Sequence, residues 1–109
     1  MPKKYRLSRA DFIRLPKAAR RVHGAYFSLT VTSSPLFGGP RVACVVSKKI
    51  SARSVDRNRI ERICRESLRP ELARLKEPAA LIFFAKREAV SATFGEIQRD
   101  ILKLLERTA

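Results

Sequence analysis

The chain has 109 residues, of which 45% are hydrophobic, enough for one compact domain with a buried core. That apolar content excludes an intrinsically disordered chain. Its 24 lysine and arginine residues against 10 acidic ones give a net charge of +14, far more than solubility requires. We therefore expect a polyanionic partner, and the spread of basic residues along the whole chain favours a nucleic acid over a membrane.

The longest apolar run, Ala79 to Ala85, is much too short to cross a bilayer, and the first six residues lead into no apolar stretch typical of a signal peptide. We therefore expect a cytoplasmic protein with no membrane partner. Cys44 lies in an apolar, strand-like segment, and Cys64 lies on the apolar side of a predicted helix. Both are expected to be reduced and buried as small hydrophobic residues, with a disulfide as the less favoured alternative.

In the first half of the chain, a short helix is predicted to begin at Ser8, a suitable N-cap, and to stop or kink at Pro16. A strand with one buried face is predicted over residues 25–32, because apolar and polar residues alternate there. The polar face of this strand comprises Tyr26, Ser28 and Thr30. The other elements expected are a short strand near residues 21–24, a loop over 33–40 and a buried strand over 42–46.

A strongly basic helix is predicted from Ser54, as its N-cap, to Arg69, just before Pro70. At about 100° per residue its apolar and basic residues separate onto opposite faces. The apolar face comprises Ile60, Ile63, Cys64 and Leu68, and the opposite face comprises Asn58, Arg62, Arg65 and Arg69. Arg57 and Arg59 lie near the helix start, where positive charge is unfavourable by about 0.3–1 kcal/mol. A bound phosphate would offset that cost.

Intrahelical ion pairs are expected between residues four apart on this helix, namely Arg57 with Glu61, Glu61 with Arg65, and Arg62 with Glu66.

The last third of the chain predicts a short helical or turn segment over residues 70–76 and a third buried strand over 79–85. Thr93 and Glu96 form a capping box that begins a final helix with apolar residues at helical spacing. The order helix, strands, helix, strand, helix predicts the α+β class, with residues 1–109 forming a single-domain α/β sandwich around a central mixed sheet.

Side chains suited to catalysis are few. His23 is the only histidine, and it forms no zinc-ligand spacing with the two cysteines. We recognise no carboxylate cluster of the two-metal type and no phosphate-binding glycine loop. An arginine-rich helix face is often merely solvated, but a nearly pure arginine row in a chain of charge +14 favours contact with phosphates. We therefore expect a binding protein without catalytic residues.

Three segments together are distinctive. Ser47-Lys48-Lys49 closes a strand, Arg57-Asn58-Arg59 opens the basic helix, and Arg62 and Arg65 to Arg69 continue it. This spacing resembles the bacterial ribonuclease P protein component. The likeness extends from about Arg6 to Arg107, and it includes the pairs Arg6-Leu7, Asp11-Phe12 and Tyr26-Phe27 and the segment Phe83 to Arg87.

The resemblance implies that the basic helix lies in a left-handed crossover between parallel strands, against the usual right-handed rule. It implies an accessory subunit of an endoribonuclease, which binds the catalytic ribonuclease P RNA and precursor tRNA in a 1:1 protein–RNA holoenzyme. The holoenzyme removes the 5′ leader by phosphodiester hydrolysis. Mg²⁺ held mainly by the RNA and the substrate performs this chemistry, and no catalytic residue or metal site is expected in the protein.

The family motif implies contacts with the catalytic RNA from Lys48, Lys49, Arg53, Arg57, Asn58, Arg59, Arg62, Arg65 and Arg69. It implies a cleft for the leader, between the first helix and the sheet, with Phe12, Tyr26, Ser28 and Thr30. Glu61 stands where the family commonly has Lys, and Pro16 and Thr30 stand where some members have aromatic residues. We therefore expect this cleft to depend less on stacking than on shape, hydroxyl groups and charge.

The main alternative is a structural RNA-binding module such as a ribosomal protein, which would share the charge and the small core. A self-sufficient nuclease and a nonspecific DNA-packaging protein are two further alternatives. The ability to support cleavage by a ribonuclease P RNA at low Mg²⁺ would separate the first hypothesis from a structural module. Cleavage of precursor tRNA by RNA-free protein would establish the nuclease, and similar affinity for duplex DNA and for precursor tRNA would indicate DNA packaging.

Overall fold

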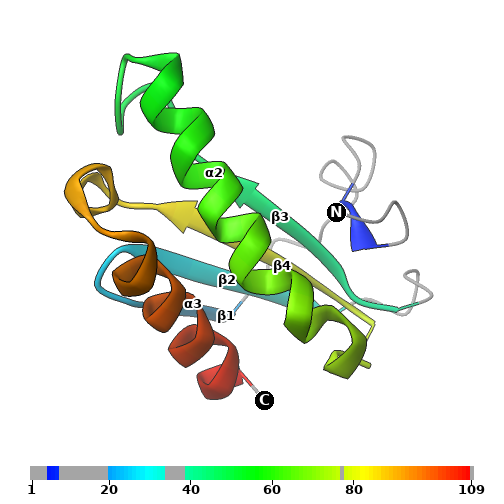
Figure 1. Ribbon diagram of the computed structural model, residues 1–109. Helices are drawn as coiled ribbons and strands as arrows, with labels where there is room; N and C mark the ends of the chain where they lie inside the picture. The colour runs from blue at the N-terminus through cyan, green and yellow to red at the C-terminus, as the bar shows by residue number, and fades with distance from the viewer. Residues whose placement is uncertain (1–4, 8–19, 34–38, 77, 109) are drawn as a thin grey trace.

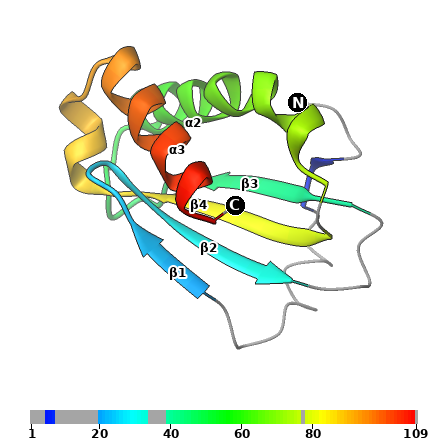
Figure 2. The ribbon, with the colours of Figure 1, turned by 90° about the horizontal axis from the view of Figure 1, so that it is seen from below.

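The computed structural model describes residues 5–7, 20–33, 39–76 and 78–108. Its strands are β1 (Arg20–His23), β2 (Phe27–Ser33), β3 (Arg41–Val45) and β4 (Ala79–Ala85), and its α-helices are α2 (Ser54–Leu68) and α3 (Phe94–Thr108). Both helices cover the same face of the sheet, as Figure 2 shows. The predicted α+β class with one mixed sheet is confirmed. The helix predicted to begin at Ser8 lies outside the described residues.

The four strands lie in the order β1-β2-β4-β3, with β4 antiparallel to β2 and parallel to β3. The central place of β4 explains its composition, because a strand covered on both faces tolerates the continuous apolar run Ala79–Ala85. The helix α2 connects β3 to β4. In Figure 1 the helices lie toward the viewer, the two parallel strands point up and to the left, and β4 lies to the left of β3. The crossover is therefore left-handed.

The core lies between the sheet and the two helices. The sheet contributes fully buried side chains such as Phe27, Leu29 and Phe83, which meet Ile60 of α2 and Ile101 of α3. Each such side chain contributes about 1.5–3 kcal/mol when it leaves water. Among the described residues, no helix is long and apolar enough to cross a membrane.

The turn between β1 and β2 is held by a carboxylate of α3. Asp100 accepts hydrogen bonds from the backbone N–H groups of Ala25, Tyr26 and Phe27 at 2.8, 2.9 and 2.9 Å. A Cβ atom at Gly24 would lie 2.5 Å from Oδ1 of Asp100, so a glycine is needed for this close approach. The predicted strand therefore begins two residues later than expected, because these amides bind Asp100.

Local signals predicted several other features, including the bounds of β4. The capping box is confirmed, since the Thr93 N–H donates to Glu96 Oε1 at 2.9 Å and the Glu96 N–H donates to Thr93 Oγ1 at 3.2 Å. The segment after α2 is a 3₁₀ helix, Arg69–Arg74, close to the short helical segment expected. A further 3₁₀ helix, Arg87–Ser91, was not predicted. The prediction of Ser54 as N-cap is wrong, because Arg53 takes that position.

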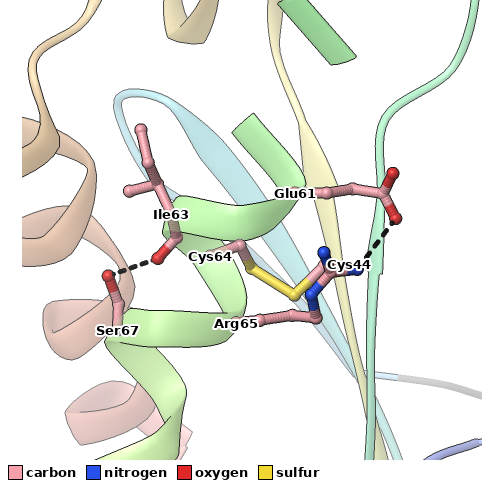
Figure 3. The surroundings of a disulfide bond; sticks show 6 residues. All are labelled: Cys44, Glu61, Ile63, Cys64, Arg65 and Ser67. Atoms are coloured by element: carbon pink, nitrogen blue, oxygen red, sulfur yellow. Dashed lines mark hydrogen bonds and ion pairs between the residues drawn. A yellow bond between two sulfur atoms is a disulfide. The ribbon is translucent and has the colours of Figure 1, made fainter. Parts of the chain in front are cut away.

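The two cysteines form a disulfide, so the prediction of reduced thiols is wrong (Figure 3). Cys44 lies beside Phe83 in the sheet register, on the face that the helices cover. Cys64 lies on the buried face of α2 and is fully buried, as expected. The two side chains therefore approach each other, with their Cα atoms 6.4 Å apart. Local sequence patterns placed each cysteine on its apolar face but could not show that the faces meet.

Candidate nucleic-acid interface

The outer face of α2 carries a row of exposed polar and basic side chains. They are Asn58, Arg62 and Arg65, followed by Arg69 at the C-cap, and they lie opposite the buried residues of the helix, as the periodicity predicted. Arg65 pairs with Glu61 at 3.6 Å, which confirms one of the three expected ion pairs. The side chains of this pair are 45% and 33% exposed, so it neutralises the row only weakly. The row therefore presents net positive charge to solvent.

Arg57 and Arg59 differ from this row, since both are half-buried and bind backbone carbonyl groups. Arg57 Nη1 donates to the Ser51 carbonyl at 2.8 Å, and Arg59 Nη2 donates to the Ala92 carbonyl at 2.7 Å. Arg57 is thus directed toward the preceding turn, and the expected pair with Glu61 is absent from the described part of the chain. Each guanidinium has five N–H donors, so one internal bond leaves others for a ligand.

The turn that enters α2 is also basic. Lys48 and Lys49 are exposed in a turn closed by a 3.0 Å bond from the Ile50 N–H to the Ser47 carbonyl. The side chain of Arg53 is 76% exposed and lies 3.9 Å from Asp56. These three cations flank the positive end of the helix dipole, which adds to the attraction for a phosphate.

A second candidate surface is the open face of the sheet, which is turned away from α2 and α3. Ser28 and Thr30 lie on it, as predicted, and they pair in register with Phe84 and Ile82 of β4. Ser28 is 8% exposed and Thr30 is half-buried. Phe12, the aromatic residue expected to lie near them, is outside the described residues.

Tyr26 does not share this face, so that part of the prediction is wrong. It precedes β2, and its hydroxyl donates to Glu96 Oε2 of α3 at 3.0 Å. This hydrogen bond to a carboxylate raises the pKa of Tyr26 above 10.0. The pKa of Glu96 is lowered below 4.5, mainly because its carboxylate accepts a hydrogen bond from the Thr93 N–H. The hydrogen bond from the Tyr26 hydroxyl is the second cause.

The open face also holds two residues that the sequence analysis did not assign to a binding site, Arg21 and Phe84. The Arg21 guanidinium carbon lies 5.6 Å from the centroid of the Phe84 ring, and Arg21 Nε donates to Thr30 Oγ1 at 3.4 Å. Strand alternation could have found both, because Val22 and Phe83 next to them are buried on the helix side. Among the described residues, no group of three or more His, Cys, Asp or Glu side chains is placed to hold a metal ion.

Comparison with known proteins agrees with this architecture. The family model described as Ribonuclease P matches residues 1–109. The ribonuclease P protein component of a Synechococcus species is 31% identical over an alignment that covers 98% of this chain and 84% of the relative. The protein of a Pseudanabaena species is 30% identical, with coverage of 98% and 93%.

Solved structures show the same fold. The Staphylococcus aureus RNase P protein mutant described as defective in mRNA degradation activity superimposes with a TM-score of 0.86. It is 27% identical to this chain, and the match covers 97% of this chain and 89% of that one. A family match along the full length, relatives of similar length and a shared fold lead to one conclusion. The chain belongs to the ribonuclease P protein component family.

Proposed function

We propose that this chain is the accessory subunit of a ribonuclease P holoenzyme, with one protein bound to one catalytic RNA. The observation that carries the proposal is the exposed row on α2, where Arg62 and Arg69 form no ion pair within the described residues. Guanidinium groups at successive helical turns suit the phosphates of a folded RNA. Lys48, Lys49 and Arg53 extend this surface at the helix start.

In this proposal the protein positions RNA and screens its charge, while Mg²⁺ bound by the RNA and the substrate supplies the hydrolytic chemistry. The α2 surface binds the catalytic RNA. The open face of the sheet, with Ser28 and Thr30, binds the unpaired 5′ leader of precursor tRNA. The holoenzyme then cleaves one phosphodiester to release the leader. Positive charge next to the RNA lowers the concentration of Mg²⁺ that the folded complex needs.

Reconstitution tests the proposal. The purified protein is mixed with a bacterial ribonuclease P RNA, and cleavage of precursor tRNA is followed as Mg²⁺ is lowered. We expect cleavage at the mature 5′ end at Mg²⁺ concentrations where the RNA alone is inactive. No rescue by the protein would overturn the proposal and favour a structural RNA-binding module. Cleavage at the same position by RNA-free protein would overturn it in favour of a self-sufficient nuclease.

The role of α2 is tested separately by salt dependence. If the protein neutralises about six phosphates, the logarithm of its affinity for the catalytic RNA falls with the logarithm of salt at a slope of roughly −5. The double variant Arg62→Ala, Arg65→Ala is expected to flatten this slope and weaken assembly, with an unchanged circular dichroism spectrum. An unchanged slope would show that α2 does not contact the RNA.

A further inference from the structure

Neither Arg21 nor Phe84 is among the contact or cleft residues that the family motif implies. Arg21 comes from the edge strand β1, Phe84 comes from the central strand β4, and β2 lies between them. The guanidinium lies over the ring, and its bond to Thr30 Oγ1 fixes one edge of the guanidinium plane. A cation held over an aromatic face in this way is electrostatically favourable.

The pair has unused binding capacity. Arg21 is exposed, and among the described residues it forms no ion pair and no hydrogen bond other than the one to Thr30. A guanidinium has five N–H donors, so four remain for a ligand. One face of this exposed side chain lies over Phe84, which leaves the opposite face for a ligand. The surface therefore offers a flat stacking plane and a positive charge at one point, with the hydroxyl groups of Ser28 and Thr30 beside it.

We propose that Arg21 and Phe84 bind one unpaired nucleotide of the precursor leader. The base stacks on the outer face of the guanidinium, and the adjacent phosphate accepts hydrogen bonds from its free N–H groups. An unpaired strand is required, because stacked neighbours cover both faces of a base inside a duplex. The pair thus supplies a stacking surface beside the hydroxyl groups of Ser28 and Thr30. This inference rests on the proposed function, in which the open face of the sheet receives the leader.

The test uses the reconstituted holoenzyme and precursor tRNA with 2-aminopurine placed in turn at each leader position. Stacking quenches the fluorescence of this base, so quenching at one position is expected with the wild-type protein. Arg21→Lys keeps the positive charge but removes the planar guanidinium group, and Phe84→Leu removes the aromatic ring beneath Arg21. Each variant is expected to abolish this quenching and to weaken the binding of leader-bearing precursor about tenfold. The binding of tRNA without a leader is expected to stay the same.

Matched controls are Arg20→Lys, on the same strand but directed to the Arg107 carbonyl of α3, and Phe94→Leu, an exposed aromatic residue at the start of α3. Both are expected to behave as wild type. Wild-type binding of the leader by Arg21→Lys, in a holoenzyme that cleaves at low Mg²⁺, would overturn this inference alone. Failure of the wild-type protein to support cleavage would overturn the proposed function instead. Because Arg21 is exposed, its variant stays informative even if Phe84→Leu does not fold.

Discussion

The Arg59 guanidinium reaches across 33 positions of the sequence to donate a 2.7 Å hydrogen bond to the Ala92 carbonyl. Ala92 is almost fully buried, and it lies just before the capping box of α3. The second arginine of the Arg57-Asn58-Arg59 motif therefore fastens α2 to the start of α3. The motif thus contains two half-buried arginines with structural bonds, Arg57 and Arg59, and one exposed residue, Asn58, which begins the exposed row that Arg62 continues.

The structural bond of Arg59 and the exposure of Arg62 predict that substitution of the first affects stability and substitution of the second affects RNA binding. Arg59→Ala is expected to lower the free energy of unfolding by about 1–2 kcal/mol, because it leaves the Ala92 carbonyl without its charged donor. Arg62→Ala, on the exposed face, is expected to change it by less than about 0.5 kcal/mol. Arg62→Ala should instead flatten the salt dependence of RNA affinity by about 0.7–0.9 in log–log slope. Urea denaturation and binding titrations measure both, and equal stability losses would contradict this prediction.

The three backbone hydrogen bonds that Asp100 accepts predict that a nearly isosteric substitution of this residue lowers stability strongly. Asp100→Asn keeps one acceptor oxygen and turns an NH₂ group toward backbone donors, so we expect a loss of about 2 kcal/mol in the free energy of unfolding. Glu106→Gln, at an exposed position on the same helix, is the matched control and should behave as wild type. Thermal and urea denaturation provide the measurement. A wild-type stability for Asp100→Asn would show that the three N–H bonds contribute little.

Periodic features of single elements could be predicted from the sequence. The two faces of α2 follow from helical spacing, and the capping box at Thr93 follows from a four-residue pattern. Ser28 and Thr30 share the open face because strand alternation is local. In each case the determining residues lie within a few positions of one another.

Contacts between distant segments could not be predicted in the same way. Tyr26 does not lie on the predicted face, because Asp100 and Glu96 accept hydrogen bonds from its amide and its hydroxyl. Both carboxylates belong to a helix some 70 residues away in the sequence. The disulfide depends on the crossover that places α2 over β3. The hand of that crossover came from family resemblance, and no local pattern specifies it.

The bond between Tyr26 and Glu96 predicts a pH dependence with a definite sign. The lowered pKa of Glu96 means that its contribution to stability is complete above about pH 4.5 and is lost as the pH falls through the folded-state value. The raised pKa of Tyr26 means that its contribution is complete below pH 10.0 and is lost as the pH rises beyond the folded-state value. The stability difference between wild type and Tyr26→Phe should therefore be largest near neutral pH. A difference that stays constant from acid to alkali in urea titrations would contradict this.

The disulfide predicts a response to reductant. Titration of unfolded protein prepared without reductant should find no free thiol, and dithiothreitol should release two. Opening a cross-link between residues 20 positions apart should lower the free energy of unfolding by about 3 kcal/mol. The double variant Cys44→Ala, Cys64→Ala is the control, because its stability should not respond to dithiothreitol. Two free thiols before reduction would show that the sulfur atoms are not joined in solution.

The pair of Glu61 and Arg65 predicts a gain of affinity. Glu61 places a negative charge beside the arginine row, and it holds Arg65 at 3.6 Å. An exposed pair of this kind is worth about 0.2–1 kcal/mol, so Glu61→Gln should free Arg65 and strengthen binding of the catalytic RNA by up to about fivefold at low salt. The gain in affinity should shrink as salt rises, because salt already screens the repulsion between Glu61 and the RNA phosphates that the substitution removes. Glu66→Gln, at an exposed position on the same helix, tests whether the loss of any acidic side chain on α2 strengthens RNA binding equally. Weaker binding by Glu61→Gln would mean that Glu61 orients Arg65 toward the RNA rather than competing with it.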